Sequence, residues 1–188
     1  MQNTNETKYQ NKIFTIPNML SLLRICLIPL IIWLYCDRKD YVMTCAVLTF
    51  SGITDIVDGI IARKCNMISD FGKVFDPIAD KLTQLTVLAC LVIRYKFMLL
   101  PIVLLVLKEA SDLLTGFLTF RKTGSVLGAE WHGKATTILI YLMMFTHIVW
   151  VDIPMIVSSI SVLVCIFMII LSAVLYGIRN IKLIQQNK

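Results

Sequence analysis

The sequence has too few charged residues to cover the surface of a soluble protein. Only 16% of its 188 residues are Asp, Glu, Lys or Arg, while 57% are apolar and the mean hydropathy is +0.79. A soluble domain of this size carries about a quarter of charged residues. The scarcity of charge therefore excludes an ordinary soluble domain and predicts a protein whose surface faces lipid.

The sequence also lacks a cysteine framework, internal repeats and low-complexity linkers. None of its six cysteines forms a Cys-x-x-Cys pair, and most lie in apolar runs, where cysteine behaves as a small apolar residue. We expect reduced thiols. Without a linker, residues 1–188 are expected to form a single membrane domain, in which residues 1–15 are a polar N-terminal segment.

Positive charge is in excess, with 18 Lys and Arg against 12 Asp and Glu. These cations lie beside apolar segments, which favours contacts with anionic lipid headgroups. No basic polar surface with interleaved aromatic residues is present, so we expect no nucleic-acid partner.

Six apolar stretches are each long enough to cross a bilayer, which takes about 20 helical residues. A backbone in lipid must satisfy its own hydrogen bonds, so these spans must be helices. Because the connections are short, we expect an all-α integral membrane protein folded as one six-helix bundle. The predicted spans are residues 16–35, 41–62, 74–93, 97–120, 135–151 and 154–178.

The distribution of Lys and Arg predicts the orientation of this bundle. Eleven of them lie on the side that holds both termini, and four lie on the opposite side. The positive-inside rule therefore predicts cytosolic termini. Three segments that break the apolar pattern, residues 16–21, 54–81 and 121–137, fall on the same side, and glycines in the third are expected to interrupt any helix. These glycines are Gly124, Gly128 and Gly133.

Four aspartates lie where a membrane span should carry none. Asp55 and Asp58 end the second stretch, and Asp76 and Asp80 begin the third. A carboxylate at bilayer depth costs a few kcal/mol. Spacings of three and four residues put each pair on one helical face. If the two helices form a hairpin, all four carboxylates converge in one cavity.

Four carboxylates so close together repel one another, so we expect cations to neutralise them. Oxygen-only ligation suits Mg²⁺, Mn²⁺ or Ca²⁺, whereas zinc prefers cysteine and histidine. Two such ions a few ångströms apart suit the transfer of phosphoryl groups. The alternatives are aspartates that cap helix ends and an ion or proton pathway of a transporter.

The residues between the two aspartate pairs favour a phosphorylated ligand. The small residues Gly59 and Ala62 let a bulky polar ligand approach the helix backbone. Arg63 can bind phosphate in a bidentate manner. Ser69 adds a hydroxyl, and Gly72 keeps the entry to the next helix open. An ion pathway needs none of these features, whereas a nucleotide diphosphate needs all of them.

Taken together, these residues form the pattern Asp55-x2-Asp58-Gly59-x2-Ala62-Arg63-x8-Gly72-x3-Asp76-x3-Asp80. The pattern resembles the signature of the CDP-alcohol phosphatidyltransferase family at every position. The six-helix pattern also fits that family, so the resemblance covers nearly the whole chain. It implies an enzyme of phospholipid biosynthesis that transfers a phosphatidyl group from CDP-diacylglycerol to an alcohol and releases CMP.

The resemblance also implies a role for each residue. Family members bind two divalent metal ions, Mg²⁺ or Mn²⁺, through four aspartates, and the last of these acts as the general base. They are commonly homodimers in contact with membrane lipids, and here the active site would face the cytosol, at the plasma membrane if the protein is bacterial. The implied metal ligands are Asp55, Asp58, Asp76 and Asp80, with Asp80 as the base. The implied CDP-lipid site comprises Asn18, Gly59, Arg63, Ser69 and Gly72.

Three further motifs, at residues 16–24, 76–81 and 131–137, are similar to the phosphatidylglycerophosphate synthase branch and favour glycerol 3-phosphate as acceptor. However, Lys108-Glu109 replaces an Arg-Glu pair of that branch, and Gly116 stands where a second arginine is often found. Phosphatidylglycerol, as in a cardiolipin synthase, and inositol phosphate, serine or another alcohol therefore stay open as acceptors. The candidate acceptor-binding residues are Lys81, Lys108, Arg121 and Lys134.

Three polar residues also have simpler interpretations. Lys108 is placed to pair with Asp112, four residues further along the same helix. We expect His132 to be solvated in a polar loop, and His147 to be hydrogen-bonded between helices.

Overall fold

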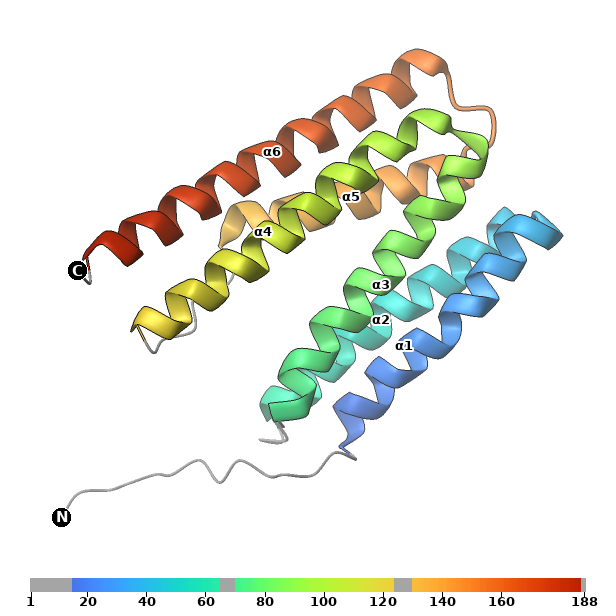
Figure 1. Cartoon of the computed structure of the whole chain (residues 1–188). Coiled ribbons are helices and arrows are strands. Elements are labelled where there is room, and N and C mark those ends of the chain that lie inside the picture. Colours follow the sequence, from blue (N-terminus) through green and yellow to red (C-terminus); the bar gives the residue numbers. More distant parts are fainter. Residues whose placement is uncertain (1–14, 65–69, 124–129, 187–188) are drawn as a thin grey trace. The chain divides into compact units, whose positions relative to one another are not determined.

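The computed structural model describes residues 15–64, 70–123 and 130–186, and these ranges are helical apart from short connections (Figure 1). They contain no strand, so the all-α prediction is confirmed. The helices are α1 (Ile16–Ile32), the π-helix η1 (Trp33–Arg38), α2 (Tyr41–Lys64), α3 (Asp70–Arg94), the 3₁₀-helix η2 (Lys96–Met98), α4 (Leu99–Thr123), α5 (Trp131–Val149) and α6 (Met155–Gln186).

Three segments of the described helices are long and apolar enough to cross a membrane. They are Pro17–Arg38, Tyr41–Ile61 and Met155–Lys182. Among the described residues, the other long helices, α3, α4 and α5, do not combine this length with so high a hydropathy and so few charges. The six-span arrangement with cytosolic termini stays a prediction.

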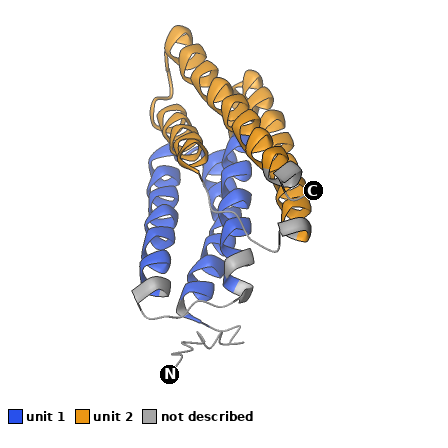
Figure 2. Cartoon of the chain, turned by 90° about the vertical axis from the view of Figure 1, so that its left-hand side faces the viewer, with its two compact units in different colours: residues 1–90 blue, residues 91–188 orange. Residues whose placement is uncertain are grey.

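The chain divides into two compact units, residues Met1–Cys90 and Leu91–Lys188 (Figure 2). In the first unit, α1 begins at the N-cap Thr15, whose hydroxyl accepts a hydrogen bond from the Asn18 N–H, and Pro17 lies in the first turn. Proline is tolerated there because its missing N–H would have no helical partner. Lys39 adopts a left-handed conformation (φ 54°) between η1 and α2.

Side-chain contacts fix how α1 and α3 run within the first unit. Ser21 near the start of α1 bonds to Asp76 near the start of α3. At the other end, the Sγ atoms of Cys36 in η1 and Cys90 in α3 lie 4.0 Å apart. The two helices are therefore parallel, and they hold the same register along their length.

The second unit contains α4, α5 and α6. Both α4 and α5 pack against α6, and the buried side chains of these three helices include Leu105, Ile140 and Ile169. His147 in α5 lies 2.8 Å from the Ser158 hydroxyl of α6, so its predicted hydrogen bond between helices is confirmed.

The prediction that Gly133 interrupts a helix is wrong, because α5 begins at Trp131 and includes it. A Cβ atom at Gly133 would lie 2.5 Å from the Tyr176 hydroxyl oxygen. The absence of a side chain at Gly133 therefore allows Tyr176 of α6 to approach α5 closely. Gly124 and Gly128 lie outside the described residues.

Candidate active site

Asp55 and Asp58 of α2 share one cationic partner, Arg24 of α1. One guanidinium nitrogen of Arg24 contacts the Asp55 carboxylate, and Nη2 donates to Asp58 Oδ2 at 2.8 Å. Arg24 is 1% exposed and Asp58 is 3% exposed, while the Asp55 side chain is 46% exposed. A charge buried this deeply needs a partner of opposite sign. The i, i+3 spacing of the aspartates presents both carboxylates to the same guanidinium.

Ser21 extends this contact to the third helix. Its hydroxyl donates to the Asp76 carboxylate, and Arg24 Nη2 donates to Ser21 Oγ at 3.3 Å. Two residues one turn apart on α1 thus join three of the four predicted metal ligands. Asp80 lies half-buried in the next turn of α3, followed by half-buried Lys81.

The structure describes some of the residues predicted to bind the CDP-lipid. Asn18 is buried in the first turn of α1, Gly72 is buried at the start of α3, and Gly59 lies one residue beyond Asp58. Arg63 belongs to the last turn of α2, but its side chain lies outside the described residues, as does all of Ser69.

Sequence reasoning missed Arg24 and Ser21 as site residues, because it used them only as part of the motif at residues 16–24. The signal was present in Arg24, which is an arginine inside a predicted span. A charged side chain at membrane depth almost always faces a partner in the protein interior.

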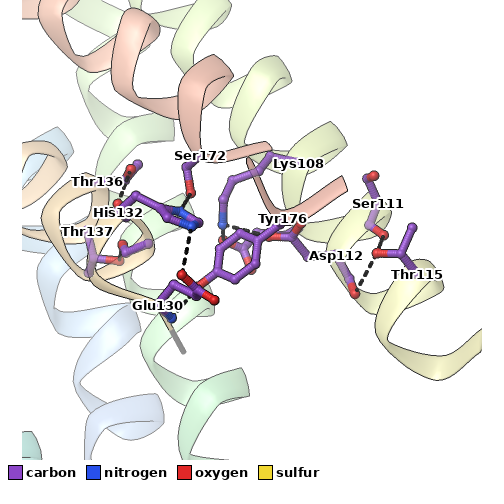
Figure 3. A network of polar contacts seen from close by, with 12 residues as sticks. Lys108, Ser111, Asp112, Thr115, Glu130, His132, Thr136, Thr137, Ser172 and Tyr176 are labelled. Carbon is purple, nitrogen blue, oxygen red and sulfur yellow. Dashed lines mark hydrogen bonds and ion pairs between the residues drawn. The ribbon is translucent and has the colours of Figure 1, made fainter. Parts of the chain in front are cut away.

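The second unit contains a separate polar network around Lys108 (Figure 3). Lys108 Nζ lies 3.0 Å from both Glu109 Oε1 and Asp112 Oδ2, which confirms the predicted pairing with Asp112. The Lys108 side chain is buried, and its charge is balanced by two carboxylates. The other acceptor candidates of this unit, Arg121 and Lys134, are exposed.

The prediction that His132 is solvated in a loop is wrong. His132 is buried in the first turn of α5, where Nδ1 lies 3.1 Å from the Ser172 hydroxyl of α6. Tyr176 of α6 packs edge-on against its ring and accepts the Glu130 N–H at 2.9 Å (Figure 3). Arg179 pairs with the Glu130 carboxylate at 2.9 Å. The start of α5 is thus fastened to α6.

The donor chemistry of the four aspartates suits a hard divalent cation, because such ions take carboxylate oxygens. The guanidinium between Asp55 and Asp58 shows that this pair is stabilised by positive charge. Within the described residues, no group of three or more His, Cys, Asp or Glu side chains is arranged to hold a metal ion.

Comparison with known proteins gives one family and several named relatives. Residues 14–176 match the sequence profile of the CDP-alcohol phosphatidyltransferases. A CDP-diacylglycerol–glycerol-3-phosphate 3-phosphatidyltransferase of Aquifex aeolicus is 28% identical over 174 residues, which are 90% of this chain and 97% of that protein. The protein of the same name from Rickettsia typhi is 48% identical over 69 residues, 36% of this chain and 39% of that protein.

A third relative carries a different name. The cardiolipin synthase (CMP-forming) of Streptomyces coelicolor is 36% identical over 111 residues, 56% of this chain and 52% of that protein. The matched segments thus span less than two thirds of the Rickettsia and Streptomyces proteins.

Proposed function

The chain belongs to the CDP-alcohol phosphatidyltransferase family, and from this premise we propose that it transfers a phosphatidyl group from CDP-diacylglycerol to an alcohol. The observation that carries this proposal is the network in which Arg24 and Ser21 bring together Asp55, Asp58 and Asp76 from two other helices. A scaffold protein or an ion pathway has no need for this network together with the nucleotide-binding pattern between the aspartates.

Glycerol 3-phosphate is the proposed acceptor, which makes phosphatidylglycerophosphate the product. The Aquifex relative, matched along 90% of this chain, bears the name of that activity. A cardiolipin-forming reaction with phosphatidylglycerol is the second candidate. It is favoured by Lys108, whose charge is already balanced by Glu109 and Asp112 and is therefore less available to an acceptor phosphate.

The proposal includes the arrangement in the membrane. Six spans with cytosolic termini would open the aspartate site to the cytosol, where a water-soluble acceptor can reach it. Two Mg²⁺ or Mn²⁺ ions would be held by Asp55, Asp58, Asp76 and Asp80, and two copies of the chain would form a homodimer.

The chain's own residues then have distinct tasks. Asn18, Gly59, Arg63, Ser69 and Gly72 bind the CDP part of the donor. Asp80 accepts the proton of the acceptor hydroxyl, since a hydroxyl is a poor nucleophile at neutral pH. The acceptor oxygen bonds to the lipid-side phosphorus as the bond to CMP breaks. Bound divalent cations would offset the charge that develops on CMP.

The test is CMP release by the purified protein from CDP-diacylglycerol, with Mg²⁺ or Mn²⁺ and a panel of alcohols. We expect release with glycerol 3-phosphate, and loss of at least about 100-fold in Asp80→Asn, because a positioned base contributes that much. Asp152→Asn is the matched control, since that side chain is 98% exposed. Release with phosphatidylglycerol alone would select the second candidate. Ion flux in liposomes without CDP-lipid, lost in Asp80→Asn, would favour a transporter.

A further inference from the structure

Gln84 is a buried polar side chain in α3 whose amide has no partner. The residue is 0% exposed, and neither Nε2 nor Oε1 has a hydrogen bond within the described part of the chain. Most buried polar groups in native proteins are hydrogen-bonded, so an unpaired amide calls for an explanation. The side chain thus carries one donor group and one acceptor atom that are both buried and without a partner.

The position of Gln84 relates it to the aspartate site. It follows Asp80 by four residues, so the two residues lie one above the other on the same helical face, about 6 Å apart along the axis. The preceding residue, Thr83, is also buried, but its hydroxyl donates to the Ala79 carbonyl at 3.0 Å. Of these two buried polar residues that follow Asp80 by three and four positions, Gln84 is therefore the one whose polar group is unpaired.

The polarity of α3 gives the direction in which a lipid would lie. Its charged residues are concentrated between Asp70 and Lys81, and residues 82–93 contain none. A donor lipid with its phosphates at Asp76 and Asp80 would place its acyl chains along the uncharged half. Between the phosphates and the acyl chains of such a lipid stand the glycerol ester groups, a few bonds from the phosphate. Gln84 lies at that boundary.

We propose that Gln84 binds the donor lipid, with its amide N–H donating a hydrogen bond to an acyl ester carbonyl of the CDP-linked lipid. The proposal rests on the proposed function, and it adds a specificity for the linkage of the lipid chains. An ester carbonyl accepts the hydrogen bond, whereas an ether-linked lipid lacks that carbonyl. The enzyme would therefore prefer ester-linked donors.

The decisive experiment compares a diester and a diether CDP-lipid with the wild-type protein and Gln84→Leu. A hydrogen bond of ordinary strength corresponds to an about 3- to 10-fold lower KM for the ester donor in the wild-type protein. In Gln84→Leu we expect this ratio to fall to about one, with kcat for the diether donor unchanged. Thr83→Val is the matched control and should keep the wild-type ratio.

A second readout does not depend on activity. Removing an unpaired buried amide should leave the Tm of the lipid-free protein unchanged or raise it, because replacing a polar group by an apolar one of similar shape removes a desolvation cost. The rise in Tm on adding diester donor should exceed the rise with diether donor in the wild-type protein, and the two should be equal in the variant. Gln84→Met provides a second variant of similar length if the leucine variant does not fold.

The outcomes separate the two proposals. Wild-type protein that releases no CMP with any alcohol overturns the proposed function, while the Tm comparison still tests Gln84. An equal response of the wild-type protein to ester and ether donors, or an ester preference retained in Gln84→Leu, overturns the role of Gln84. A markedly lower Tm of both lipid-free variants would show that the amide serves the fold and would also overturn it.

Discussion

At the scale of single residues, Arg24 neutralises the aspartates of α2. Its guanidinium touches Asp55 and Asp58, and it is almost completely buried. Removing one partner of a buried ion pair leaves an uncompensated charge and costs about 3–5 kcal/mol. Arg24→Met should therefore lower the free energy of unfolding by about that amount, as measured by denaturant unfolding in detergent. Excess Mn²⁺ should restore part of the loss, because it can neutralise the same carboxylates.

The control for this prediction is Arg38→Met, which removes an exposed arginine that lies 4.8 Å from the Trp33 ring centre. We expect a change within about 0.5 kcal/mol there, as for most surface substitutions. Equal effects of the two substitutions would contradict the assignment of Arg24 to the aspartate site.

Gly133 and Gly116 form a second matched pair at this scale. A Cβ at Gly133 would collide with the Tyr176 hydroxyl, whereas a Cβ at Gly116 would meet nothing within 4 Å. Gly133→Ala should lower stability by about 1–3 kcal/mol, the usual cost of overpacking. Gly116→Ala should be neutral or stabilise α4 by about 0.5–1 kcal/mol, because glycine is a poor helix former. Thermal unfolding of both variants checks this, and a stable Gly133→Ala protein would show that Tyr176 can move away.

The aspartates of the candidate site could be predicted from sequence, whereas their partners on α1 could not. The aspartates stood out because carboxylates in an apolar stretch are costly and their spacing places each pair on one face. The partners Arg24 and Ser21 depend on the register between α1, α2 and α3, which no spacing within one helix can reveal. Gln84 was missed for a similar reason, since an amide becomes informative only once its surroundings are known to lack a partner.

At the scale of elements, the parallel register of α1–η1 and α3 can be tested through Cys36 and Cys90, whose Sγ atoms lie 4.0 Å apart. Diamide accepts two electrons and two protons from a thiol pair, so it should convert these cysteines into a disulfide. Cys36 and Cys90 are the pair of thiols in contact within the described residues, so Cys45 and Cys165 should not form a disulfide. Mass spectrometry of peptides alkylated before and after reduction measures the outcome. If Cys36 and Cys90 stay freely alkylatable after diamide, the two helices do not hold this register.

Most helix positions followed from the lengths of the apolar stretches, but the start of α5 did not. Glycine at 133 indicated a break, because glycine lowers helix propensity. In the structure, contact with Tyr176 of α6 requires a residue without a side chain at that place, and α5 begins earlier, at Trp131. A similar tertiary requirement explains His132, whose partner Ser172 lies 40 residues away in the sequence.

At the scale of the whole molecule, the charged residues of the candidate site lower the hydropathy of the helices that carry them. Within the described helices, three segments meet the length and hydropathy of a membrane span. The α3 helix carries Asp76, Asp80 and Lys81, and α4 carries Lys108, Glu109 and Asp112. Charges of this kind lower the hydropathy of a helix although they are paired inside the protein. In a six-span bundle that contains a charged site, the helices that carry the site are therefore expected to have a lower hydropathy than other spans, although they also cross the membrane.

The six-span arrangement makes a sharp prediction about which positions face each side of the membrane. In a cysteine-free variant, single cysteines at Lys39 and Asp152 should react in intact cells with a maleimide that cannot cross membranes, because both lie in predicted outer connections. Cysteines at Arg121 and Lys134, both exposed side chains, should react only after the membrane is permeabilised. An even number of membrane crossings between Asp152 and the C-terminus would instead place Asp152 and the C-terminus on the same side of the membrane. Labelling of Arg121→Cys in intact cells would thus overturn both the orientation and the cytosolic opening of the aspartate site.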